Sequence, residues 1–187
     1  MNQKGISLVE LIVAMAVAAV IGWIIVSAFT NMNRAVIDQN TVVDLQSTGR
    51  NAMATMVRIL RETGFDPWDT GKFGIEESIA TKLRITRNIH FNDDPSQEEE
   101  IDEGFQERVT FEFIPGPPGQ PGSLRRCFDE GTAMESCAEM SNDVEDLTFT
   151  YPDARTIVIN LTLRGDKADG RQEFTRTLTT TVQGRNP

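Results

Sequence analysis

The chain has 187 residues, which suits one medium-sized domain with room for an extra element and argues against a multidomain enzyme. Its formal net charge is −10 at pH 7, and a negative field repels phosphate backbones, so general nucleic-acid binding is disfavoured. One histidine and two cysteines leave little material for a zinc site or a cysteine–histidine nucleophile. Most metalloenzyme and cysteine-enzyme functions are therefore excluded.

The hydrophobic residues are concentrated at the N-terminus. From Leu11 to Phe29 the chain has no charged residue, and this length matches the roughly 20 residues that a helix needs to cross a hydrocarbon core. Lys4 precedes the segment, whereas Arg34 after it is balanced by Asp38 and Asp44. Because positive charge favours the cytoplasmic side, we predict one spanning helix with a cytoplasmic N-terminus.

A cleaved secretory signal peptide is the alternative for this segment. Ala16-Val17-Ala18 has the small-x-small form of a cleavage site, and residues 8–15 would serve as the apolar region. However, Glu10 would lie inside that apolar region, and cleavage after Ala18 would leave a strongly apolar mature end. Both features favour a retained spanning helix.

Glu10 needs an explanation, because a charged side chain in a spanning helix costs about 2.5–3.5 kcal/mol on insertion scales. It follows Lys4, Gly5 and Ile6 at fixed offsets in the segment MNQKGISLVELIVAMAVAAV, residues 1–20. This segment closely resembles the prepilin N-terminus of type IV pilins and type II secretion pseudopilins. In that pattern a short basic leader ends in Gly and is followed by an apolar residue and by an acid at the fifth mature position.

The resemblance implies a processing and assembly pathway. Prepilin peptidase would cut after Gly5 on the cytoplasmic side and N-methylate the new amine of Ile6, which stands where Phe is usual. The acid that matches Glu10 pairs in this family with the freed amine of a neighbouring subunit. The implied partners are therefore other pilins or pseudopilins and an inner-membrane assembly platform, before the chain enters a periplasmic or cell-surface filament. The span lacks the Pro of many major pilins, which favours a minor subunit.

Later segments also resemble this family, in particular PilW-like minor pilins and GspJ-type pseudopilins. They are residues 49–65, which end in LRETGF, residues 142–153 (NDVEDLTFTYPD) and residues 174–187 (FTRTLTTTVQGRNP). The first function considered is a minor pilin of a type IV pilus, in its assembly or at its tip. The alternatives are a GspJ-like type II secretion pseudopilin and, from another class, a signal-anchored periplasmic binding protein or enzyme.

The rest of the chain changes from a helical to a strand pattern. Apolar or small residues recur with a spacing of three or four between Ala35 and Ile59, which predicts that the spanning helix continues into water and ends near Gly64. Alternating apolar residues then predict strands around residues 83–91, 109–113, 147–151, 157–163 and 174–182. A long helix that covers an antiparallel sheet is an α+β fold.

We expect four parts in chain order. They are a leader at residues 1–5, a spanning helix at 6–30, an amphipathic helix at 31–63 and a globular β-sheet domain at 64–187.

The acid-rich stretch from Asp93 to Glu107 has no lysine or arginine. Clustered carboxylates suit calcium, but the spacing does not match a calcium-binding loop, so a solvated loop is favoured and we expect no cofactor. Its acids are Asp93, Asp94, Glu98, Glu99, Glu100, Asp102, Glu103 and Glu107.

Cys127 and Cys137 would lie outside the cytoplasm, where an oxidising compartment favours a disulfide over free thiols. The run PGPPGQPG at 115–122 is too short for a collagen helix and is expected to form a stiff polyproline-like connection. His90 lies in no nucleophile motif, so no catalytic site is expected. Arg125 and Arg126 are the residues best placed for a local phosphate contact in DNA uptake, which the overall charge disfavours.

Overall fold

The computed structural model describes residues 7–64, 74–88, 107–153, 156–166 and 173–183. One helix precedes seven strands along the chain, and the strands form one antiparallel sheet in sequence order. The elements are α1 (Leu8–Leu60), β1 (Ile75–Ile79), β2 (Lys82–Thr86), β3 (Arg108–Ile114), β4 (Gly122–Phe128), β5 (Ser136–Asp153), β6 (Thr156–Asp166) and β7 (Glu173–Gln183). The expected α+β fold is confirmed, with one long helix packed on a curled antiparallel sheet.

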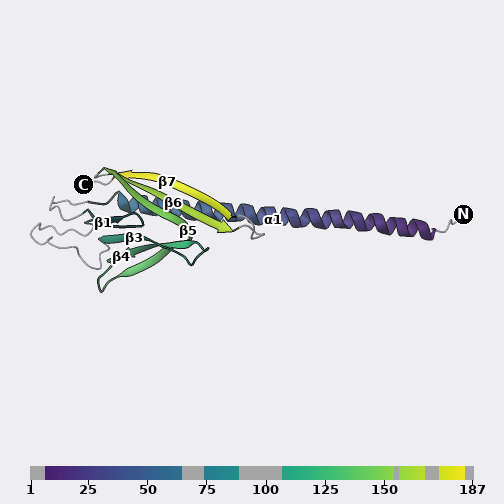
Figure 1. The fold of residues 1–187 in the computed structure, drawn as a ribbon, viewed down its shortest axis with the longest axis horizontal. Helices are drawn as coiled ribbons and strands as arrows, with labels where there is room; N and C mark the ends of the chain where they lie inside the picture. The colour runs from purple at the N-terminus through teal and green to yellow at the C-terminus, as the bar shows by residue number, and fades with distance from the viewer. Residues whose placement is uncertain (1–6, 65–73, 89–106, 154–155, 167–172, 184–187) are drawn as a thin grey trace, which may run out of the picture.

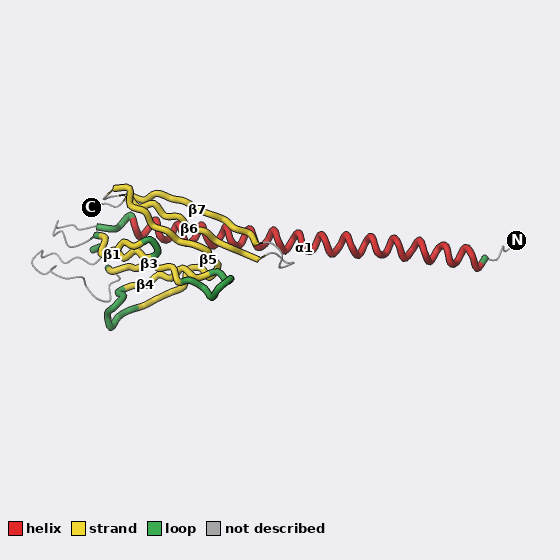
Figure 2. The backbone as a smooth tube through the Cα atoms, in the orientation of Figure 1, coloured by secondary structure: helices red, strands yellow, loops and turns green. Residues whose placement is uncertain are grey.

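The helix α1 is continuous across the boundary expected at residues 30 and 31. Its N-terminal half projects beyond the sheet and its C-terminal half lies along the sheet (Figures 1 and 2). A short turn follows, in which Gly64 adopts a positive φ of 69° and donates its backbone N–H to the carbonyl of Thr86. A glycine suits this left-handed position, and the helix therefore ends where the sequence indicates.

The sheet curls along β5, because different parts of this strand pair with its two neighbours. The first part of this 18-residue strand pairs with β4, and the second part pairs with β6, with register shifts in both pairings. The tip between β1 and β2 closes the curl, since the carbonyl of Ala80 accepts a hydrogen bond from the Phe149 N–H at 2.8 Å. The shifts let one strand bend from one half of the sheet into the other.

The core lies between the concave face of the sheet and the C-terminal half of α1. Along the described helix, the buried side begins at Leu45 and repeats every three or four residues, with Gly49, Ala52, Met53, Met56, Ile59 and Leu60. Alternate strand residues meet it, including Leu83, Val109, Phe111, Leu124, Leu147, Ile157, Ile159, Leu161 and Leu163. The helical and strand periods read from the sequence therefore point their apolar sides at each other.

Two strands and one connection differ from the sequence-based expectations. The strands β1 and β4 were not predicted, since both contain charged residues at positions where a simple alternation would place apolar ones. The expected polyproline-like connection at 115–122 is wrong: the run joins β3 and β4 through a tight turn. In that turn Gln120 donates to the Pro117 carbonyl at 2.9 Å, and Gly119 has a φ of 84°, which glycine tolerates after Pro118.

Candidate functional site: the N-terminal helix

Glu10 lies in the first turn of α1 and has no cation near it among the described residues. Its carboxylate accepts a hydrogen bond from the backbone N–H of Ser7 at 3.2 Å, and the side chain is exposed. The first cation within the helix is Arg34, which a rise of 1.5 Å per residue places roughly 36 Å away along the axis. Within the described residues, Glu10 therefore has only a local backbone donor.

The helix around Glu10 has no protein covering. α1 contains a segment long and apolar enough to cross a membrane, and none of that segment is buried in the structure. Large apolar side chains are exposed on all sides, among them Leu8, Ile12, Val17, Ile21, Trp23, Ile25 and Phe29. A helix that is apolar all round and unburied is suited to a hydrocarbon environment or to packing against other helices.

The two residues of the expected cleavage site, Gly5 and Ile6, lie outside the described residues. The description of the chain starts at Ser7, which precedes the first helical residue, Leu8. The offset of four positions between Ile6 and Glu10 remains a feature of the sequence, and cleavage, methylation and assembly at these residues remain predictions.

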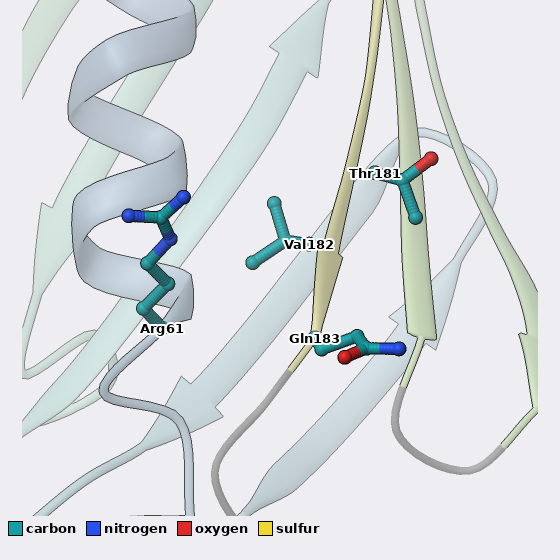
Figure 3. A pocket seen from close by; sticks show the side chains of 4 residues that line it. All are labelled: Arg61, Thr181, Val182 and Gln183. Carbon is teal, nitrogen blue, oxygen red and sulfur yellow. The ribbon is translucent and has the colours of Figure 1, made fainter.

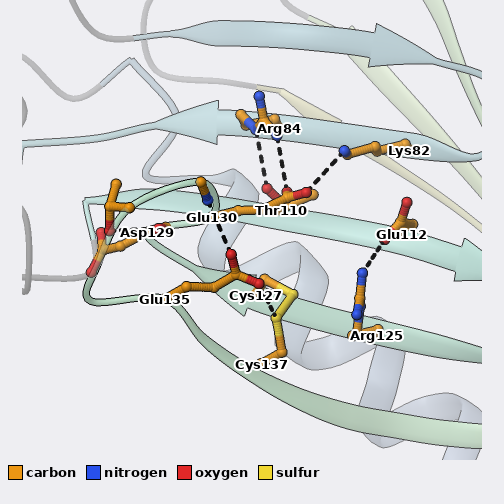
Figure 4. Close-up of a disulfide and its surroundings, with 12 residues drawn as sticks. Lys82, Arg84, Thr110, Glu112, Arg125, Cys127, Asp129, Glu130, Glu135 and Cys137 are labelled. Carbon is orange, nitrogen blue, oxygen red and sulfur yellow. Dashed lines mark hydrogen bonds and ion pairs between the residues drawn. A yellow bond between two sulfur atoms is a disulfide. The ribbon is translucent and has the colours of Figure 1, made fainter.

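Cys127 and Cys137 form a disulfide across β4 and β5, with the two sulfur atoms 2.02 Å apart. The two residues are direct partners in the strand pairing, so the bond joins the two strands of the hairpin next to its loop (Figure 4). The connection between these strands contains two residues with positive φ, Asp129 at 51° and Gly131 at 86°. The expected disulfide is therefore present and holds the loop 129–135.

Ion pairs that were not predicted connect this loop to β2 (Figure 4). Glu130 accepts from Lys82 at 3.0 Å and pairs with Arg84 at 3.1 Å, both on β2. Burial by itself would raise the pKa of the Glu130 carboxyl, but hydrogen bonds from Thr110, Lys82 and Arg84 outweigh it and lower that pKa to about 2. No sequence signal identifies Glu130, because its partners lie on a strand more than 40 positions earlier.

The described residues contain one group with metal-ligand geometry, Cys127, Glu135 and Cys137. Its two sulfur atoms are bonded to each other, so the group lacks the thiolates that a metal would need. The acid-rich stretch lies outside the described residues except for Glu107, which is buried. His90 also lies outside them.

The two adjacent arginines are already engaged within the protein. Arg125 pairs with Glu112 at 2.6 Å on the neighbouring strand β3. The Arg126 guanidinium lies 4.6 Å from the centre of the Phe128 ring, which is the geometry of a cation–π contact. Neither guanidinium is therefore presented as a free phosphate ligand.

A pocket of about 450 Å³ lies between the end of α1 and the last residues of β7 (Figure 3). It is lined by Arg61, Thr181, Val182 and Gln183. Among the described lining residues, Arg61 is the only charged one, and none is a carboxylate, histidine or cysteine. The pocket can therefore receive an anionic or polar group, but its lining holds no general base.

Comparison with known families supports the prediction of a prepilin-type N-terminus. Residues 1–26 match the family described as the prokaryotic N-terminal methylation motif. No curated protein and no solved structure matches the chain significantly. Proteins with this motif are structural subunits. The motif implies processing by prepilin peptidase and assembly with other pilins. The motif, together with the long apolar helix that follows it, makes the N-terminal part of the chain similar to that of type IV pilin-like proteins.

Proposed function

We propose that this protein is a minor pilin, a structural subunit that takes part in assembly of a type IV pilus or lies at its tip. Prepilin peptidase removes residues 1–5 by cutting after Gly5 and methylates the amine of Ile6. The mature chain is held in the bacterial inner membrane by α1, with its N-terminus cytoplasmic and its sheet domain in the periplasm. It then enters a filament through contacts between spanning helices.

The environment of Glu10 is the observation that carries this proposal. Among the described residues, this carboxylate in an apolar, uncovered helix has only a backbone N–H as its partner. Because an unpaired charge in hydrocarbon is costly, a cation from another molecule is favoured beside it. The freed amine of a neighbouring pilin, shifted by about one helical turn, supplies such a cation.

The exposed helix beyond the span supports the same proposal. Met32, Val36 and Val43 are exposed and lie along one side of α1, opposite the side that Leu45 and Gly49 present to the sheet. An apolar stripe on the water-exposed part of a helix fits contact with a neighbouring helix in an assembly. A monomeric anchored enzyme has no need of it.

Replacement of Glu10 tests the proposal in cells that hold the complete assembly machinery. We expect Glu10→Ala to reach normal levels in the membrane but to be recovered in sheared filaments at least tenfold less than wild type. Asn31→Ala is the matched control, because it replaces a polar residue of the same helix outside the span, and it should assemble normally. Equal recovery of Glu10→Ala and wild type would contradict the assembly role and favour a monomeric anchored protein.

Mass spectrometry of the mature N-terminus tests the processing step. We expect the chain to start at methylated Ile6. A start at Met1 in cells with active peptidase, or at Ala19, contradicts it.

The type II secretion alternative shares this processing, so deletion of the gene is needed to distinguish it from a pilus role. Loss of pilus-dependent adhesion or motility supports a pilin, and loss of exoprotein secretion supports a pseudopilin.

A further inference from the structure

The strand β7 is a long and regular edge of the sheet. Its 11 residues from Glu173 to Gln183 all pair with β6 without a register shift. Within the part of the chain that the structure describes, no strand pairs with its other side, and it lies at the outer margin of the sheet (Figure 1). This side of β7 therefore has no partner strand among the described residues, which leaves the edge available to a strand of another chain.

The opposite edge, β1, has features that discourage such pairing. It has 5 residues, contains a register shift between Ile75 and Glu77, and carries the adjacent acids Glu76 and Glu77. Short length, bulges and charge are the devices by which proteins protect an edge. β7 has no proline and no bulge, and its only charged residues are Glu173 and Arg176. The two edges of one sheet thus differ in their suitability for pairing.

The contacts of α1 fix the direction of β7 relative to the apolar span. Gly49 lies against Leu178, and Arg61 lines a pocket with the end of β7, from Thr181 to Gln183. β7 therefore runs in the same direction as α1, away from the span. A partner anchored in the same membrane must approach with its own helix in this direction as well.

A second copy of this chain does not satisfy that condition. Two β7 strands paired antiparallel would point their α1 helices in opposite directions, so both spans could not enter one membrane. Two β7 strands paired parallel about an axis along the strand would place the helices on opposite faces of the joined sheet, beyond the 8–10 Å at which helices pack. Pairing of β7 with β1 of a copy is disfavoured because β1 is short and carries a bulge.

We infer that the free edge of β7 binds an edge strand of a different pilin-like subunit anchored alongside in the same membrane, so that one sheet continues between subunits. This inference rests on the proposed function, because it needs a neighbour in that membrane. The partner strand is largely uncharged and places apolar side chains beside Phe174, Leu178 and Val182, which face the core.

Charge adds a second condition on the partner strand. Arg176 is exposed at the edge, and Arg61 lines the pocket at the far end of β7; neither has an ion-pair partner among the described residues. A partner carboxylate placed at either position is attracted to an unpaired cation, whereas a lysine or arginine there is repelled.

Two threonines on the outer face provide a matched test by photo-crosslinking. Thr181 on β7 and Thr150 on β5 are both exposed and lie in one row, because each is paired with Val158 of β6. A photo-reactive amino acid is placed at each position in the full chain, in cells with the complete machinery. We expect the Thr181 probe to form an adduct with another pilin-like subunit at least fivefold more often than the Thr150 probe. Equal adducts, no adduct at Thr181, or an adduct with a second copy overturns the inference.

Lysine replacement at the same positions tests the edge through assembly. We expect Thr181→Lys combined with Thr175→Lys to reduce recovery in sheared filaments at least tenfold, while Thr150→Lys leaves it unchanged and all variants keep the wild-type unfolding temperature. If wild type itself does not enter filaments, the proposed function fails. If wild type and the lysine variants enter equally, the edge inference alone fails.

Discussion

Among single residues, Glu130 shows how one mostly buried carboxylate can hold a loop. Its carboxylate joins the loop after β4 to Lys82 and Arg84 on β2, and the disulfide holds the same loop from its other side. The pairing depends on ionisation of Glu130. Because its pKa is about 2 in the folded chain against an ordinary value of 4.5, the folded state binds this proton more weakly than the unfolded chain.

Acid should therefore weaken the protein through Glu130. The stabilisation is fully present above about pH 4.5 and is lost as the pH falls toward 2. We expect Glu130→Gln to lower the free energy of unfolding at pH 7 by on the order of 1 kcal/mol, after allowance for solvent screening, and to show less further loss between pH 4.5 and 2.5. Denaturant titrations across this pH range measure it. Glu139→Gln removes an exposed acid on β5 and should change neither value.

At the scale of elements, the fit of α1 on the sheet depends on small residues at the closest approach. A Cβ atom at Gly49 would lie 2.5 Å from Leu163 Cδ1 and 2.7 Å from Leu178 Cδ1, and one at Gly165 would lie 2.6 Å from Leu45 Cδ1. These contacts bring β6 and β7 against the helix where the core begins.

A larger side chain at Gly49 should therefore separate the helix from the sheet. We expect Gly49→Leu to lower the free energy of unfolding by about 1–3 kcal/mol, as overpacking does in well-packed cores. Ala54→Leu adds the same kind of bulk on the exposed side of α1 and should change stability by less than about 0.5 kcal/mol. Equal losses in the two variants, measured by chemical denaturation, would contradict the close approach.

The disulfide joins β4 and β5 next to the loop that connects them. Reduction should release the end of the β4–β5 hairpin and lower the free energy of unfolding by about 2–3 kcal/mol, because the loop it closes is short. Unfolding with and without reductant measures this difference. Cys127→Ser with Cys137→Ser should match the reduced wild type and no longer respond to reductant; a continued response would show that reductant acts elsewhere.

In the whole molecule, two parts of the chain differ in what covers their apolar side chains. The apolar span needs lipid or other helices, whereas the sheet domain has its own core. Along the described length of α1, burial begins only at Leu45. The apolar span therefore contributes nothing to the core of the sheet domain, although both belong to one continuous helix.

Removal of residues 1–30 should therefore leave a soluble chain whose thermal unfolding midpoint matches that of the full chain in detergent within about 2 °C, since no buried contact is lost. Calorimetry or circular dichroism of the two chains measures this. A large fall in the midpoint would mean that the N-terminal half of α1 supports the sheet domain.

The apolar span, the acid at Glu10, the helical and strand periods and the disulfide partners could be predicted from the sequence alone, because each depends on the order of residue types along a short stretch. It missed β1 and β4, where charged residues interrupt the apolar alternation, and it mistook the turn around Gly119 for an extended connection. The ion pairs of Glu130, the approach of Gly49 to Leu178 and the edge position of β7 become visible only in the folded chain. These join segments distant along the chain, and the curl of β5, which brings them together, is set by packing against α1 rather than by local propensity.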